Sequence, residues 1–321
     1  MSGTTDFAAA QRVNRRNTFV LLLALTLIAA LVGYLIGWAL EGTVTDVVPA
    51  WSAAGLVAAA LMAAASLCWS AVSLAFGDRM VLTMSGARQI EKTDAPVLYN
   101  VVDEMSVAAG QPMPRVMVLD TDLLNAFATG NTARSGTIVV TRGLIEKLSR
   151  DELQGVVAHE MAHLANLDTR YMTVVGVTVG LIALVADMIL RTLNWGGSVN
   201  ARSSSGKKDS SGGAAVLLII VLIVVAIFAP LAAKAVQMAV SRQREYLADA
   251  TSVQFTRNPN GLISALQKLD QNAAPFPGVS HATQHLFIVN PVQHFTADTP
   301  ALLATHPDIA DRIARLRNMG G

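Results

Sequence analysis

An uncharged apolar run near the beginning of the chain limits the folds open to it. Residues 18–40 contain no charged side chain, and as a helix they are long enough to cross the ~30 Å hydrocarbon core of a bilayer. Residues 53–76 are also uncharged, although their alanine content makes them a weaker insertion signal. Two later apolar runs span residues 171–193 and 212–233. We therefore expect about four transmembrane helices.

The composition agrees with a chain that is only partly embedded in a membrane. Charged residues make up 15% of the chain and the mean hydropathy is +0.45. These values are too apolar for an ordinary soluble domain and too polar for a pure membrane bundle. We expect a mainly α-helical integral membrane protein that also carries a folded soluble part.

Cysteine count and net charge exclude several kinds of site. The single cysteine, Cys68, excludes an intramolecular disulfide and a cysteine-based zinc or redox centre. A net charge of +1 without a basic stripe gives no reason to expect a nucleic-acid partner.

Basic residues set the expected orientation. Arg12, Arg15 and Arg16 precede the first apolar run, which favours a cytoplasmic N-terminus by the positive-inside rule. A cleaved signal peptide is the alternative. The first apolar run is longer than the apolar region of a usual signal peptide, and no cleavage site of small residues follows it. We therefore expect that the run is retained as a membrane anchor. Counting the crossings places residues 78–170 and 234–321 in the cytoplasm.

The loop between the last two apolar runs conflicts with this topology. Residues 194–211 carry Arg202, Lys207 and Lys208, more positive charge than an external loop should have. A shallow third and fourth pair of helices that does not cross fully would remove the conflict. The predicted organisation has four parts. Residues 1–77 form a tail with two transmembrane helices, and residues 78–170 form the first part of the soluble domain. Residues 171–236 form two further transmembrane helices joined by a Ser- and Gly-rich loop, and residues 237–321 form the second part of the soluble domain.

The first soluble block has the pattern of a small α+β domain. Ala95-Pro96 is a helix start signal, and residues 99–109 have helical spacing. Residues 115–120 and 137–141 have strand character and predict a small sheet. Ser149 followed by Glu152 predicts a capping box at the start of another helix.

That helix carries His159, Glu160 and His163 in an HExxH pattern. Residues four apart lie one turn above each other on the same face, so the two imidazoles can converge on one Zn²⁺. Glu160 then sits beside the metal, where its carboxylate can take a proton from water and pass it to a leaving amine. No Pro or Gly follows His163 until Gly176, so we expect the helix to continue unbroken into the third apolar run.

A second histidine pair serves as an internal comparison. His281 and His285 have the same spacing, but no acid or base stands next to the first histidine. We interpret this pair as structural, or at most as lying near the cleft.

Two histidines leave a catalytic zinc site incomplete, because such sites usually have three protein ligands and an open position. The only glutamate after the motif is Glu245, and Asp249 stands four residues later on the same expected face. We assign Glu245 to the metal, and Asp249 to the far N–H of a ligating histidine. The alternative is that both acids pair with Arg242 and Arg244 on a helix surface.

The order of these features resembles the HtpX-like membrane zinc metalloproteases, a family related to the CAAX prenyl proteases. The resemblance covers most of the chain. Beyond the apolar runs and HExxH, it rests on segments that follow in order: Arg244-Glu245-Tyr246 with Ala248-Asp249, residues 256–266, residues 285–291, and Thr305-His306-Pro307 ahead of Asp311-Arg312-Ile313.

The resemblance implies a zincin-like α+β metalloprotease domain that holds one Zn²⁺ per chain. Its implied ligands are His159, His163 and Glu245, with Glu160 as catalytic base. It further implies a multi-pass endopeptidase of a prokaryotic inner membrane, with its active site facing the cytoplasm. The implied partners are the lipid bilayer and protein substrates, namely damaged or misassembled membrane proteins.

A sheet edge is a candidate for binding substrate. Asn125, Ala126 and Phe127, with the strand at residues 137–141, could pair with the backbone of an extended peptide. Ordinary sheet core is an equally good interpretation of the same residues.

Three residues outside the strands have two interpretations each. His306, in a Pro-bounded turn, could stabilise the oxyanion or could serve only to begin a helix. Asn166 and Asp168 follow the motif, and we expect them to cap or orient its helix rather than to touch substrate.

Two other functions fit parts of the sequence. An intramembrane site-2-type protease also carries HExxH beside apolar segments, but it expects an acidic ligand in a Pro- and Gly-rich segment, and residues 258–261 offer no carboxylate. The non-enzymatic alternative is a metal-stabilised membrane scaffold that does not cut. The intact base at Glu160 argues against it.

Overall fold

The computed structural model describes residues 7–45, 50–178, 242–272 and 307–319. These residues belong to two compact units. One unit contains the described residues of 1–18, 73–177 and 236–321, and the other contains those of 19–72 and 178–235. The first unit carries the HExxH motif.

The first two apolar runs form long helices, as predicted. Helix α1 spans Phe7–Thr45 and helix α2 spans Ala53–Ser85. Ala9–Trp38 and Ala53–Ser85 are long and apolar enough to cross a membrane. Of the predicted third span only residues 171–178 are described, as helix, and the fourth lies outside the described residues. Four crossings therefore stay a prediction, and two candidate membrane helices are shown.

Within the apolar unit, glycines bring α1 and α2 into close contact. A Cβ added at Gly33 would lie 2.6 Å from the Ala58 carbonyl oxygen, and one added at Gly37 would lie 2.5 Å from that of Ala54. Such small-residue contacts allow apolar helices to pack backbone to backbone.

A mixed four-stranded sheet lies in the first unit. Its strands are β1 (Arg88–Gln89), β2 (Arg115–Leu119), β3 (Ala126–Thr129) and β4 (Thr137–Thr141), in the order β1-β2-β4-β3. β2 and β4 are parallel, whereas β1 and β3 run antiparallel to their neighbours. The predicted strands at residues 115–120 and 137–141 are confirmed, and the two-residue β1 was not predicted.

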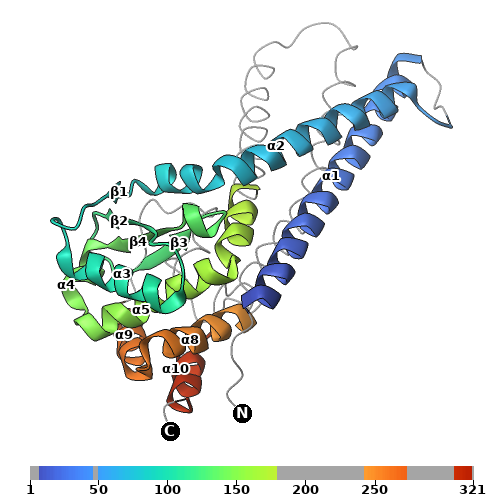
Figure 1. The fold of residues 1–321 in the computed structure, drawn as a ribbon. Coiled ribbons are helices and arrows are strands. Elements are labelled where there is room, and N and C mark those ends of the chain that lie inside the picture. The colour runs from blue at the N-terminus through green and yellow to red at the C-terminus, as the bar shows by residue number, and fades with distance from the viewer. Residues whose placement is uncertain (1–6, 46–49, 179–241, 273–306, 320–321) are drawn as a thin grey trace, which may run out of the picture. The chain divides into compact units, whose positions relative to one another are not determined.

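Helices cover one side of this sheet. α3 (Pro96–Ala109) and α5 (Arg150–Asn166) pack against each other, and α5 also contacts β3, β4, α8 and α9 (Figure 1). Further described helices are α4 (Arg142–Lys147), α8 (Arg242–Thr256), α9 (Pro259–Gln271) and α10 (Ile309–Arg317). α5 is thus the central helix of the unit.

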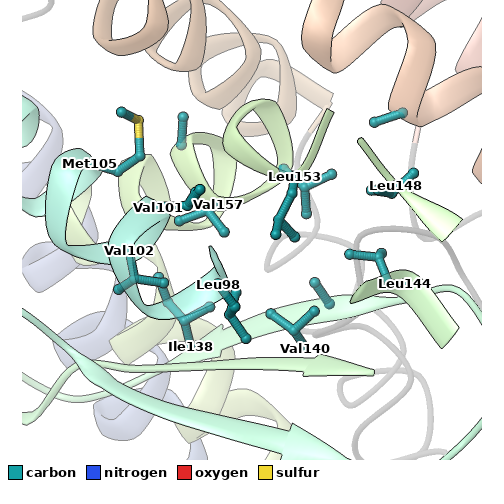
Figure 2. Packing of buried hydrophobic residues seen from close by; sticks show 14 of the residues in the cluster. Leu98, Val101, Val102, Met105, Ile138, Val140, Leu144, Leu148, Leu153 and Val157 are labelled. Carbon is teal, nitrogen blue, oxygen red and sulfur yellow. The ribbon is translucent and has the colours of Figure 1, made fainter. Parts of the chain in front are cut away.

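Apolar side chains of α3, β4 and α5 form the core that holds α5 in place. Figure 2 shows them pointing toward one another, with these residues labelled on the three elements: Leu98, Val101, Val102 and Met105; Ile138 and Val140; Leu153 and Val157. Burying one such side chain contributes about 1.5–3 kcal/mol. The core therefore fixes the backbone that carries the motif.

The predicted capping box at the start of α5 is confirmed. The Ser149 hydroxyl accepts from the Glu152 N–H, and the Glu152 carboxylate accepts from the Ser149 N–H at 2.7 Å. The same carboxylate pairs with Lys268 of α9 at 2.7 Å. Burial raises the pKa of Glu152, but the bonds from Lys268 and Ser149 outweigh it, so the pKa is lowered overall.

The expected unbroken helix beyond the motif is wrong. α5 ends at Asn166, because Leu167 adopts the left-handed conformation with φ 58° and its N–H bonds back to the carbonyls of His163 and Leu164. A new helix begins at residue 168. A left-handed residue other than glycine costs about 1–2 kcal/mol, so the surrounding contacts must stabilise this break.

Two glycines set how closely α5 approaches α9. A Cβ added at Gly155 would lie 2.6 Å from the Leu262 nitrogen, and one added at Gly261 would lie 2.5 Å from the Asp151 carbonyl oxygen. Gly155 stands one helical turn before His159. This backbone contact therefore also positions the first histidine of the motif.

We predict that Gly155→Ala destabilises the folded protein, because a methyl group cannot fit without moving α9. The expected loss is about 1–3 kcal/mol, measured by chemical denaturation in detergent. Val107→Ala is the control, because Val107 is 77% exposed on α3. Equal stability of the two variants would contradict the close α5–α9 contact.

Candidate metal centre

Three side chains expected to bind metal converge in the first unit. His159 and His163 come from α5 and Glu245 comes from α8, and one ligand atom of each lies within 4.8 Å of the others. The Nε2 atoms of the two histidines are 3.2 Å apart, and each lies 3.5 or 3.6 Å from a Glu245 carboxylate oxygen. All three residues are buried.

Each imidazole is held from behind by a carboxylate. His159 Nδ1 lies 3.0 Å from Asp249 Oδ1, and His163 Nδ1 lies 2.9 Å from Asp168 Oδ2. A carboxylate in this position accepts the Nδ1 proton, which leaves a lone pair on Nε2. The two Nε2 lone pairs then face each other, an arrangement that a cation between them stabilises.

The donor set and its spacing fit a zinc ion. Two donors about 2.1 Å from a tetrahedral Zn²⁺ lie about 3.4 Å apart, close to the separations of 3.2 to 3.6 Å between these atoms. Two histidines and one glutamate also form a ligand set of catalytic zinc sites with an open fourth position.

The electrostatic field of the site favours positive charge. Burial lowers the pKa of His159, but Asp249 and Glu245 outweigh it and raise the pKa to about 9. The pKa of His163 is also raised, because Asp168 and Glu245 outweigh its burial. The carboxylates that favour a proton on these rings also favour a divalent cation.

Arg312 of α10 is a residue of the site to which the sequence analysis gave no role. It is fully buried and binds Asp249 through two bonds, Nε to Oδ2 at 2.9 Å and Nη2 to Oδ1 at 2.7 Å. Its Nη1 lies 3.7 Å from Glu245 Oε2. Burial raises the pKa of Asp249, but Arg312 and His159 lower it to about 2, so this carboxylate stays charged.

A sequence signal for Arg312 was present. It stands four residues before the buried Leu316 and three after the partly buried Ile309, so it lies on the apolar face of an otherwise polar helix. An arginine on such a face needs a buried anion as partner.

Asp168 has a more specific place than the cap or helix-orienting role expected for it. In a continuous helix, a residue five positions after His163 would lie about 140° around the axis. The left-handed Leu167 instead turns the chain so that Asp168 reaches His163 Nδ1. Asn166 is buried beside it, and its side-chain amide has no hydrogen-bond partner among the described residues.

Glu160 follows His159 on α5 and is 2% exposed. Burial raises the pKa of its carboxyl above the ordinary value, while His159 and His163 oppose that shift. A buried carboxyl with a raised pKa is suited to accept a proton and release it again.

The predicted sheet edge is only partly present. Residues 137–141 form β4, which pairs with β2 on one side and β3 on the other, so the edge interpretation of that strand is wrong and it belongs to the sheet core. Ala126 and Phe127 belong to β3, the last strand in the sheet order, which contacts α5. Asn125 precedes it and is tied to β4, since its carbonyl accepts from the Thr141 N–H at 3.0 Å. All three residues are buried. His306, His281 and His285 lie outside the described residues.

Comparison with known proteins identifies relatives over nearly the whole chain. The model of peptidase family M48 matches residues 92–320. A protein named "Protease HtpX homolog" from Listeria innocua is 40% identical over 308 residues, which are 95% of this chain and 97% of that protein. A protein of the same name from Tropheryma whipplei is 41% identical over 260 residues, which are 81% and 84%.

A solved structure gives a more distant likeness. The crystal structure of S. mikatae Ste24p is 18% identical with a TM-score of 0.42, covering 77% of this chain and 58% of that chain. The sequence matches, and not this likeness, carry the family assignment. These relatives and the two apolar helices indicate a membrane metalloprotease. The chain belongs to peptidase family M48 and is of the HtpX type.

Proposed function

We propose that this chain is a membrane-bound zinc endopeptidase in which His159, His163 and Glu245 hold the metal. Membership of family M48 implies a metal, usually zinc. The observation that carries the assignment is the convergence of the two Nε2 atoms with the Glu245 carboxylate, each imidazole being backed by its own carboxylate. Arg312 supports the same arrangement by fixing Asp249 next to Glu245.

Bound zinc supplies Lewis-acid chemistry, because it polarises the scissile carbonyl and makes water a stronger acid. Glu160 acts as general base and accepts the proton of the attacking water. The same carboxyl then donates that proton to the leaving nitrogen, which completes hydrolysis. Burial, which raises the pKa of Glu160, supports both steps.

The proposed substrates are unfolded or misassembled membrane proteins. Support comes from the apolar helices α1 and α2 and from the family to which the chain belongs. The arginines that precede the apolar run support an active site on the cytoplasmic side of the membrane. The HtpX homologues support a prokaryotic inner membrane.

We predict that Glu160→Gln keeps its zinc and loses cleavage. The amide cannot accept a proton, so the rate should fall about 10²–10⁴-fold, measured on an unfolded substrate in detergent beside wild type. Zinc content is measured on the same samples. If both proteins hold zinc and neither cuts any substrate or itself, the non-cutting scaffold is the better description.

We predict that Glu245→Ala releases the metal, because only two imidazoles remain as ligands. Zinc per chain, measured by atomic absorption after dialysis, should fall toward zero. Glu146→Ala is the matched control, since Glu146 lies at the surface and pairs with Arg142. Unchanged zinc in Glu245→Ala would show that another residue is the third ligand.

Zinc binding should release protons at neutral pH. The pKa of about 9 means that His159 is protonated at pH 7 in the metal-free protein, and a ligating Nε2 must lose that proton. Zinc affinity should therefore rise roughly tenfold or more per pH unit from pH 6 and level off above about pH 9. Competition titrations with a chelator of known pH dependence measure this, and a flat profile from pH 6 to 8 would contradict it.

A further inference from the structure

The first turns of α1 lie in the same compact unit as the metal centre. Gln11, Asn14 and Thr18 follow one another at helical spacing and share a face of the helix. Asn14 is 4% exposed, whereas Arg15 and Arg16 beside it are exposed. Asparagine is a weak helix former, and a buried amide needs polar partners.

Two of these side chains cap the end of the motif helix. The last four carbonyls of an α-helix have no partner within it, and in α5 the Leu167 N–H serves the first two of them. Gln11 Nε2 donates to the Ala165 carbonyl at 2.8 Å, and Asn14 Nδ2 donates to that of Asn166 at 3.0 Å. The start of α1 therefore supplies donors to the other two carbonyls.

Asn14 makes a further bond that Gln11 does not share. Its Nδ2 also donates to Asp168 Oδ1 at 2.7 Å, while the other oxygen of the same carboxylate binds His163 Nδ1 at 2.9 Å. Both hydrogens of the amide are thus used. The Asp168 carboxylate is held between Asn14 and His163, so its orientation depends on both.

The carbonyl oxygen of the same amide contacts α8, the helix that carries Glu245. Arg244 Nη1 donates to Asn14 Oδ1 at 3.2 Å, and Arg244 immediately precedes Glu245 on α8. Asn14 therefore joins the end of α5, which carries the two histidines, to the helix that carries Glu245. Neither Asp nor an apolar residue offers a donor and an acceptor in these two directions.

We propose that Asn14 is a positioning residue of the metal centre, which fixes the Asp168 carboxylate behind His163 and ties α5 to α8. This inference rests on the proposed role of His163 as a metal ligand. Substitution of a group that orients a metal-ligating histidine typically weakens metal affinity 10- to 100-fold. Asn14 contacts the Asp168 carboxylate and not the histidine itself, so we expect an effect at the lower end of that range.

The test compares Asn14→Ala with Gln11→Ala in the intact protein in detergent. Zinc affinity is measured by competition with a chromophoric chelator, and the Co²⁺-substituted protein is examined by visible absorption. Asn14→Ala should weaken zinc binding roughly tenfold and shift the Co²⁺ bands, whereas Gln11→Ala should change affinity less than about twofold. Gln11→Ala is a matched control because it removes a cap bond of the same kind without contact to Asp168.

Equal effects of the two variants would show that Asn14 only caps the helix and would overturn the proposal. Unchanged zinc affinity in Asn14→Ala would overturn it as well. In an Asp168→Ala background, the effect of Asn14→Ala should become much smaller, because only the contact with Arg244 is then left to lose. An undiminished effect in that background would contradict the assigned route.

A second variant covers the case in which Asn14→Ala does not fold. Asn14→Asp keeps the size of the side chain and the partner for Arg244, but it turns an acceptor toward Asp168. It should weaken zinc binding at least as much, and wild-type affinity in this variant would overturn the proposal. A wild-type chain that binds no zinc would overturn the proposed function itself, whereas a zinc-binding wild type with unaffected Asn14 variants would overturn only this inference.

Discussion

Two imidazole nitrogens, Nε2 of His159 and Nε2 of His163, face each other 3.2 Å apart in the interior of the protein. With Asp249 and Asp168 accepting the protons at Nδ1, lone pairs on both facing atoms would repel each other, so the pair needs a proton or a cation between them. Much of the surrounding structure holds this pair in place. The sheet and α3 fix α5 through the apolar core, and the contact at Gly155 and Gly261 sets the distance between α5 and α9.

The charges around the pair explain why a divalent cation suits the site. The carboxylates of Glu160, Glu245, Asp249 and Asp168 are all buried, and Arg312 is the buried guanidinium that pairs with Asp249. A buried charge is tolerated when it is paired and hydrogen-bonded. Arg312 and a divalent cation balance most of this negative charge. Glu160, whose pKa burial raises, is then the carboxylate best placed to exchange a proton.

Sequence patterns predicted the parts of this structure that depend on local spacing. The capping box at Ser149, the strands β2 and β4 and the helix that begins at Pro96 are local signals, and the structure confirms them. The structure also brings Glu245 to the histidine pair. The sequence could point to this residue because the i, i+4 rule places His159 and His163 on one face and because Glu245 is the only glutamate after the motif.

The parts that were missed depend on long-range contacts or on strained backbone. Nothing in the local sequence marks Leu167 as left-handed, since glycine is the usual residue there, and the reach of Asp168 to His163 depends on that break. Arg312 and Asn14 come from helices far away in sequence, and their partners are known only once those helices pack against α5 and α8. For Arg312 the available sequence signal was its place on the apolar face of α10.

In the proposed metal centre, His159, His163 and Glu245 hold one zinc ion. Anomalous diffraction at the zinc absorption edge, from crystals of the intact protein, tests it most directly. One anomalous peak is expected, within coordination distance of both Nε2 atoms and of the Glu245 carboxylate. A peak at any other position, or a zinc ion that leaves Glu245 uncoordinated, would contradict it.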